Sequence, residues 1–130
     1  METLEEFIIK HRKNEEKSKS FPQYLSELIA KKGFKKDSEV YNKALVSKQH
    51  WSLIMSEKIE PSLNTLLKIV FALELNNHEC KYLLKKAGYT LAASSKFALI
   101  VRYHIENQIY DLNEVNKQLE KYGYGDSLIY

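Results

Sequence analysis

The side chains that could serve as a nucleophile, a base or a metal ligand are few and scattered along the sequence. They are His11, His50, His78, His104 and Cys80. No two histidines have the HxxxH or HExxH spacing that brings two imidazoles to one metal on a helix. Cys80 stands among apolar positions, as a buried structural thiol does, and a single cysteine cannot form an intramolecular disulfide. We therefore expect that the chain is not an enzyme and holds neither a metal nor a cofactor.

A second group of side chains, in the middle of the chain, has the chemistry of macromolecular recognition. Gln49 can pair with two hydrogen-bonding atoms of an adenine edge, and Lys48 can reach guanine or a phosphate oxygen. Helical spacing turns Trp51, Ile54 and Met55 toward a core. The outward positions are then the candidate base contacts, namely Lys48, Gln49, Ser52 and Leu53.

Lysines flank this segment and could contact a phosphate backbone. The candidate phosphate contacts are Lys35, Lys36, Lys43 and Lys58, together with the hydroxyl group of Ser47. The alternative is that these lysines are ordinary solvated residues at helix ends. The sequence has no arginine between Arg12 and Arg102, although arginine makes the commonest specific contact with guanine.

Length and composition predict one mildly basic domain rather than several. The chain has 130 residues, a formal net charge of +3 and 44% hydrophobic residues. The first twenty residues mix five acidic with five basic side chains, unlike a secretory signal peptide. No apolar run approaches the roughly 18 residues that a membrane-spanning helix needs. We expect a cytoplasmic protein with no membrane partner.

Capping residues and apolar spacing predict a series of short helices and no strand. Helix starts are expected near residues 3, 21, 37, 47, 62, 77, 95 and 111. The charged residues 12–20 are expected to be a frayed helix end or a linker. Because no stretch alternates apolar and polar residues with a period of two, the expected fold class is all-α.

Two helices of about nine residues joined by a tight turn, followed by Pro61-Ser62, have the layout of a helix-turn-helix. Pro61-Ser62 and the following Leu63-Asn64-Thr65-Leu66-Leu67-Lys68-Ile69, with Ala72-Leu73, resemble a segment of the lambda-repressor/Cro-like (XRE-like) family. The resemblance covers about residues 21–88 and implies a lambda-repressor-like five-helix core. In that core Ser47 would start the recognition helix. Residues 1–20 would form an N-terminal helix and charged linker, and residues 89–130 two additional helices packed on the same domain.

The chain departs from this family at positions near the expected interface. Asp37 stands where the family usually has a phosphate-binding Gln, and Tyr41 where a small residue allows close helix crossing. Leu45 replaces the glycine of the turn, Met55 the usual Glu, and Glu57 the following Gly. Two functions therefore remain open. The first is a DNA-binding transcriptional regulator, and the second is a divergent module that binds a protein partner in a phage- or defence-related system.

Tyrosines crowd the C-terminal part of the chain. Aromatic side chains with a polar tip are enriched at protein interfaces. We therefore expect a homodimer interface that includes Tyr103, Tyr110, Tyr122 and Tyr124. The alternative is that these tyrosines close the core of the monomer.

Overall fold

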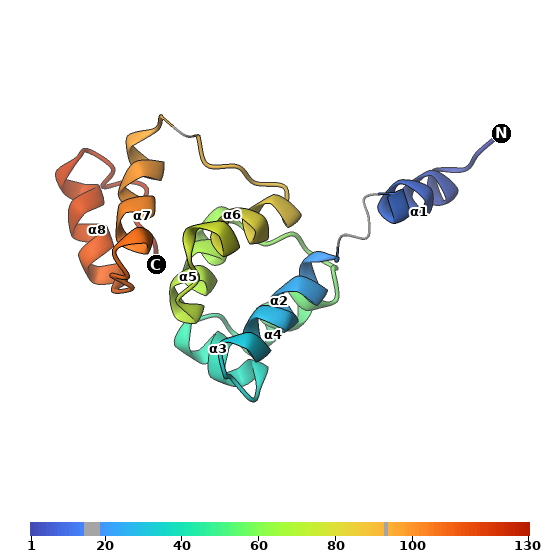
Figure 1. Cartoon of the computed structure of the whole chain (residues 1–130), viewed down its shortest axis with the longest axis horizontal. Helices are drawn as coiled ribbons and strands as arrows, with labels where there is room; N and C mark the ends of the chain where they lie inside the picture. Colours follow the sequence, from blue (N-terminus) through green and yellow to red (C-terminus); the bar gives the residue numbers. More distant parts are fainter. Residues whose placement is uncertain (15–18, 93) are drawn as a thin grey trace.

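The computed structural model describes residues 1–14, 19–92 and 94–130. Within these residues it contains eight α-helices and no strand, which confirms the all-α prediction (Figure 1). The helices are α1 (Leu4–Asn14), α2 (Phe21–Lys31), α3 (Asp37–Lys43), α4 (Lys48–Met55), α5 (Leu63–Leu73), α6 (Asn77–Lys86), α7 (Lys96–Glu106) and α8 (Leu112–Lys121). The charged segment expected to be a linker includes residues 15–18, which lie outside the described residues.

Side-chain caps set the starts of most of these helices. The hydroxyl oxygens of Ser47 and Ser62 accept hydrogen bonds from the backbone amides of His50 and Thr65, both at 3.1 Å. Ser20 caps α2 and Asn76 caps α6 in the same way, each within a reciprocal capping box. A cap satisfies amides that the first helical turn leaves without partners, so these polar residues determine where each helix begins.

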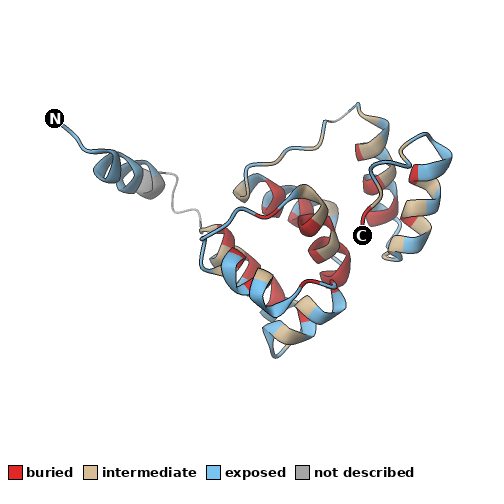
Figure 2. Cartoon of the chain, turned by 180° about the vertical axis from the view of Figure 1, so that it is seen from behind, coloured by how far each residue is buried: buried red, intermediate tan, exposed pale blue. Residues whose placement is uncertain are grey.

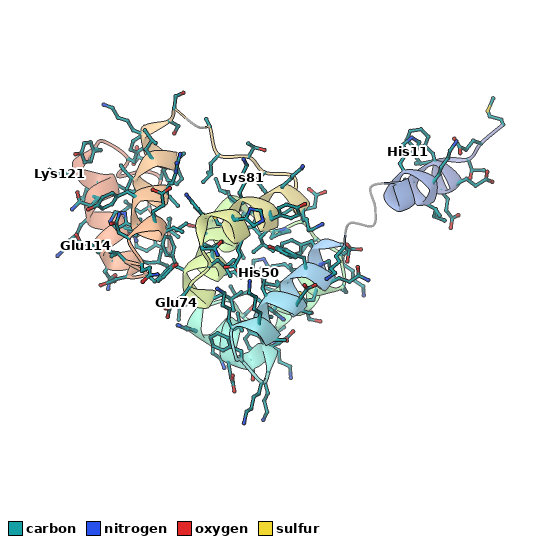
Figure 3. The ribbon with its side chains drawn as sticks, in the orientation of Figure 1. His11, His50, Glu74, Lys81, Glu114 and Lys121 are labelled. Atoms are coloured by element: carbon teal, nitrogen blue, oxygen red, sulfur yellow. The ribbon has the colours of Figure 1, made fainter. Side chains whose placement is uncertain are left out.

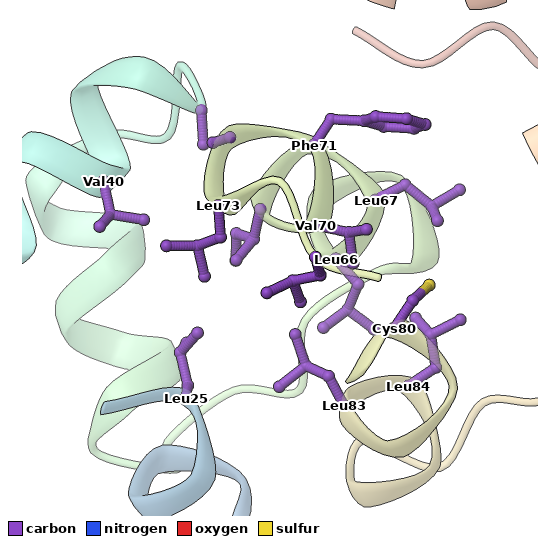
Figure 4. Packing of buried hydrophobic residues seen from close by; sticks show 14 of the residues in the cluster. Leu25, Val40, Leu66, Leu67, Val70, Phe71, Leu73, Cys80, Leu83 and Leu84 are labelled. Carbon is purple, nitrogen blue, oxygen red and sulfur yellow. The ribbon is translucent and has the colours of Figure 1, made fainter. Parts of the chain in front are cut away.

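Helix α5 is the centre of the core. Eight of its eleven residues are buried, so other parts of the chain cover more than one face of this helix. Leu25 of α2, Val40 of α3 and Leu83 of α6 pack toward it with no exposed surface (Figure 4). Cys80 lies in the same cluster, and burial raises the pKa of its thiol to about 12. The thiol is therefore protonated and unreactive at neutral pH.

Helices α7 and α8 form a hairpin that is tied to the α5–α6 region at both ends. The hydroxyl group of Tyr110 donates to the carbonyl oxygen of Leu75 at 2.8 Å. At the C-terminus, the side-chain amide of Asn116 forms two hydrogen bonds of 2.8 Å with the backbone of Ile129. The side-chain amide of Asn64 on α5 binds the backbone of Tyr130 in the same two-bond manner. These contacts fix the last residues of the chain against α5 and α8.

A buried carboxylate joins α2 to α6. Glu79 of α6 lies 2.9 Å from the ammonium groups of both Lys31 and Lys32, and its side chain is 4% exposed. The same carboxylate accepts a hydrogen bond from the backbone amide of Asn76. Burial raises the pKa of Glu79, but the hydrogen bonds from Lys31, Asn76 and Lys32 outweigh it and lower the pKa to about 2. The two lysines therefore have a structural role at the α2–α6 contact.

Helix α1 projects from the rest of the chain (Figure 1). Every side chain from residue 1 to residue 11 is exposed, including those of Leu4, Phe7 and Ile8 (Figure 2). None of the helices in the described part of the chain is long and apolar enough to cross a lipid bilayer.

Candidate nucleic-acid interface

A tight turn connects α3 to α4 and sets the angle between them. Leu45 adopts a left-handed backbone conformation with φ of 57°, and its side chain is 80% exposed. The buried side chains of Ala44 and Val46 anchor the turn on either side, and Lys68 of α5 donates to the carbonyl oxygen of Leu45 at 3.2 Å. The position where the family resemblance expects glycine thus keeps a glycine-like backbone although it carries a leucine.

Helix α4 turns its apolar side chains inward and its polar ones outward. Trp51 and Ile54 are buried, at 4% and 1% exposure, and Met55 is half-buried. All four candidate base contacts are exposed, namely Lys48, Gln49, Ser52 and Leu53. The helix therefore has the phase that the spacing predicts, with hydrogen-bonding groups of Lys48, Gln49 and Ser52 on its outer face.

Trp51 ties α4 to α3. Its indole N–H donates to a carboxylate oxygen of Asp37 at 3.0 Å, and its ring lies 5.8 Å from that of Tyr41, centroid to centroid. Helix α3 begins at Asp37, as expected from the sequence, and Lys36 occupies the cap position without a side-chain hydrogen bond. Asp37 and Tyr41, which both depart from the family pattern, thus both contact Trp51. A buried indole N–H needs a hydrogen-bond acceptor, and Asp37 supplies it.

The candidate phosphate contacts differ in how free they are to bind. Lys35, Lys36 and Lys58 are exposed at the ends of α3 and α4. Lys43 lies 3.5 Å from the carboxylate of Glu74 and 5.7 Å from the centre of the Phe34 ring. The oxygen of Ser47 already accepts the capping hydrogen bond, so only its hydroxyl hydrogen remains to donate.

Apolar side chains also lie exposed next to this face. Besides Leu45, the side chain of Leu53 is 40% exposed and that of Ile59 is 37% exposed. The backbone amides of Lys58 and Ile59 both donate to the carbonyl oxygen of Leu53, so Ile59 follows closely on the end of α4. Sequence reasoning identified Leu53 as an outward position but did not identify Ile59.

The four C-terminal tyrosines divide into two pairs. Tyr103 and Tyr122 are more than half exposed, and both line the groove between α7 and α8. Tyr110 and Tyr124 are half-buried within the chain, where Tyr110 binds Leu75 and Tyr124 packs edge-on against Phe97 at 5.9 Å. The second pair therefore contributes to the monomer core, which was the alternative for this cluster.

The outer face of α4 carries side chains that can form hydrogen bonds and ion pairs, namely Lys48, Gln49 and Ser52. His104 is buried, with Nδ1 2.7 Å from the carbonyl oxygen of Ile100. Among residues 1–14, 19–92 and 94–130, no group of three or more His, Cys, Asp or Glu side chains is placed to hold a metal ion. Comparisons with protein-family models, with curated proteins and with solved structures give no match for this chain.

Proposed function

We propose that this chain is a DNA-binding transcriptional regulator of the XRE-like helix-turn-helix type. In this proposal α2–α6 form the lambda-repressor-like five-helix core, and α4 is the recognition helix. The observation that carries the proposal is the outer face of α4, where Lys48, Gln49 and Ser52 are exposed opposite the buried Trp51. These three side chains supply the donors and acceptors that read base edges in a major groove.

The dimensions of α4 suit this role. An α-helix with its side chains is about 10–12 Å across, and a B-DNA major groove is about 12 Å wide and admits an α-helix. Lys35 and Lys36 precede α3, and Lys58 follows α4, so exposed ammonium groups lie at the ends of both helices. Such groups bind phosphates and set the position of the recognition helix without reading the sequence.

The proposal includes a homodimer in which Tyr103 and Tyr122 contribute to the contact. A palindromic operator is read by two recognition helices about one DNA turn apart, so a single copy supplies only half of the contacts. The exposed rings of both tyrosines in the α7–α8 groove support this part of the proposal. In this proposal the regulator works in the cytoplasm.

Substitutions at Gln49 and Lys36 should weaken DNA binding in two different ways. Gln49→Ala should weaken binding to a preferred duplex by about 1–3 kcal/mol and spare random DNA, because a base contact carries discrimination. Lys36→Ala should weaken all duplexes alike and make the logarithmic salt slope shallower by about one, because a phosphate contact releases counterions. Fluorescence polarisation against selected and random duplexes over a salt series measures both effects.

Lys117→Ala is the matched control, because Lys117 is an exposed lysine on α8 outside the α3–α4 face. It should leave the salt slope unchanged. Equal loss from Lys36→Ala and Lys117→Ala would show that binding is unspecific attraction to the whole surface. Equal loss of selected and random DNA from Gln49→Ala would contradict its role as a base contact.

The exposed leucines at the same face favour a second candidate function, the binding of a protein partner. Leu45 is the most exposed of these side chains and is held in a left-handed backbone conformation that costs an L-residue roughly 1–2 kcal/mol. An apolar contact at Leu45 and Leu53 would use both side chains.

Leu53→Asp separates this second candidate from the first. If the partner is a protein, the added charge should abolish its capture, because an unpaired carboxylate is costly in an apolar contact. The fold should be retained, because Leu53 already faces solvent. A pull-down with wild-type and Leu53→Asp protein, with Ser56→Asp as an exposed control on the next turn, measures the effect. Equal capture by wild type and Leu53→Asp would exclude a partner site at Leu53.

A further inference from the structure

We propose that the groove between α7 and α8 binds a small, neutral aromatic molecule with one N–H or O–H donor, and that the imidazole of His104 accepts the hydrogen bond from that donor. The groove forms within one chain, so the inference needs neither DNA nor a second copy. It shares Tyr103 and Tyr122 with the proposed dimer contact, and titration at two protein concentrations distinguishes the two uses.

The groove has the size and the lining of a small-molecule site. Its volume of about 500 Å³ lies within the range of roughly 300–1,000 Å³ that such sites have. Its apolar walls come from Leu99 and Ile100 of α7 and from Ile109, which follows α7. The backbone amide of Ile109 donates to the carbonyl oxygen of His104 at 2.8 Å, so the segment after α7 is held at one end of the groove.

Two exposed aromatic rings line the groove. Tyr103 of α7 is 58% exposed and Tyr122 of α8 is 54% exposed. The ring of Tyr103 stands edge-on to the imidazole of His104, with 5.3 Å between the centroids. An aromatic ligand can stack on such rings or pack edge-on against them, and aromatic pairs are stabilised beyond the apolar area that they bury. The lining therefore favours an aromatic ligand over an aliphatic one.

His104 supplies a hydrogen-bond acceptor in this groove. The residue is 3% exposed and lines the groove. Its Nδ1 lies 2.7 Å from the carbonyl oxygen of Ile100, and because a carbonyl oxygen only accepts, Nδ1 carries the hydrogen. In the neutral imidazole Nε2 then has a lone pair, and no donor from the described part of the chain is bonded to it. A buried acceptor without a donor is costly, so a ligand with one donor gains affinity here.

The charged side chains of the groove balance each other. Lys96 and Glu114 line it with one positive and one negative charge (Figure 3 labels Glu114). Lys96 is exposed at the start of α7, where water solvates its ammonium group. On α8 the carboxylate of Glu114 accepts a hydrogen bond of 3.3 Å from the side-chain amide of Gln118. Since the two charges cancel, we expect a neutral ligand whose donor binds His104.

Indole and 1-methylindole test the inference as a matched pair of probes. The two molecules share one ring system, but only indole has an N–H that can donate to Nε2 of His104. Calorimetric titration of the full-length chain should give a dissociation constant for indole about tenfold or more below that for 1-methylindole, because the methylated probe leaves the acceptor unpaired. His104→Phe, which keeps a ring but removes the acceptor, should bind both probes alike. The comparison of the probes on the wild-type chain does not depend on the folding of this variant.

Tyrosine variants and the protein concentration provide the controls. Tyr103→Ala and Tyr122→Ala should each weaken both probes about threefold or more, whereas Tyr130→Ala, at an exposed position outside the groove, should change neither affinity. Absence of binding at about 5 mM indole, or equal affinity of the wild-type chain for both probes, would overturn the inference. Indole affinity that falls as the chain is concentrated would overturn it as well, because a second copy would then cover the groove. The titration contains no DNA, so its failure leaves the DNA-binding proposal untouched.

Discussion

Trp51→Ala should lower the free energy of unfolding by about 3–5 kcal/mol, as other truncations of large buried aromatic side chains do. The indole is 4% exposed, donates to Asp37 at 3.0 Å and packs against the ring of Tyr41. Its removal leaves a cavity between α3 and α4 and breaks the hydrogen bond that joins them. Chemical denaturation followed by circular dichroism measures the loss.

Trp51→Phe and Asp37→Asn separate packing from hydrogen bonding in this effect. Trp51→Phe keeps an aromatic ring in the core but removes the N–H, and Asp37→Asn keeps an acceptor oxygen. We expect Trp51→Phe to cost about 1–2 kcal/mol, because Asp37 is exposed and water can replace the lost N–H donor. Asp37→Asn should cost less, because the amide oxygen can still accept the hydrogen bond from the indole. An unchanged denaturation curve for Trp51→Ala would show that α4 does not pack through this residue.

Acidification should destabilise the protein between about pH 5 and pH 2 through Glu79. The folded-state pKa of about 2 lies below the ordinary value of 4.5, so the stabilisation is complete above pH 4.5 and is lost as the pH falls through the folded value. A shift of this size corresponds to about 3 kcal/mol. We expect about 2–3 kcal/mol, because Lys31 is largely exposed and solvent screens its charge.

Glu79→Gln should remove most of this pH dependence and lower stability at pH 7 by a similar amount. Glutamine can still complete the capping box with Asn76, so the substitution removes only the negative charge that pairs with Lys31 and Lys32. Glu120→Gln, at an exposed position on α8, should keep the wild-type profile. Parallel profiles for wild type and Glu79→Gln from pH 2 to pH 7 would contradict this role of Glu79.

Local sequence signals predicted the helices well because helix starts and helix faces depend on near neighbours. Ser47 and Ser62 cap the helices that the sequence assigned to them, and the inward phase of α4 follows from the spacing of Trp51 and Ile54. The contacts between distant segments could not be predicted in this way. The hydrogen bonds of Asn64 with Tyr130 join residues 66 positions apart, and only the packing of the hairpin α7–α8 brings them together.

The candidate interface could likewise be predicted where it depends on near neighbours, but not where it depends on contacts between helices. The helical spacing of the apolar residues predicts that Gln49 is exposed on α4. The ion pair of Lys43 with Glu74 depends instead on how α3 packs against the end of α5. Tyr110 and Tyr124 read like interface residues in the sequence, but their rings find partners within the chain. A tyrosine satisfies its hydroxyl group at an interface or in a core equally well, so residue type does not distinguish the two.

Binding of the wild-type chain to duplex DNA at about 50 mM salt, followed by a salt series, tests the proposed function most directly. Electrostatic association is strongest at low salt, so even unspecific contacts of the exposed lysines should be measurable there. We predict saturable binding whose logarithm falls linearly with the logarithm of the salt concentration, and a selected duplex that binds more tightly than random ones. Absence of duplex binding at about 50 mM salt would contradict the DNA-binding function and leave the protein partner as the function of the α3–α4 face.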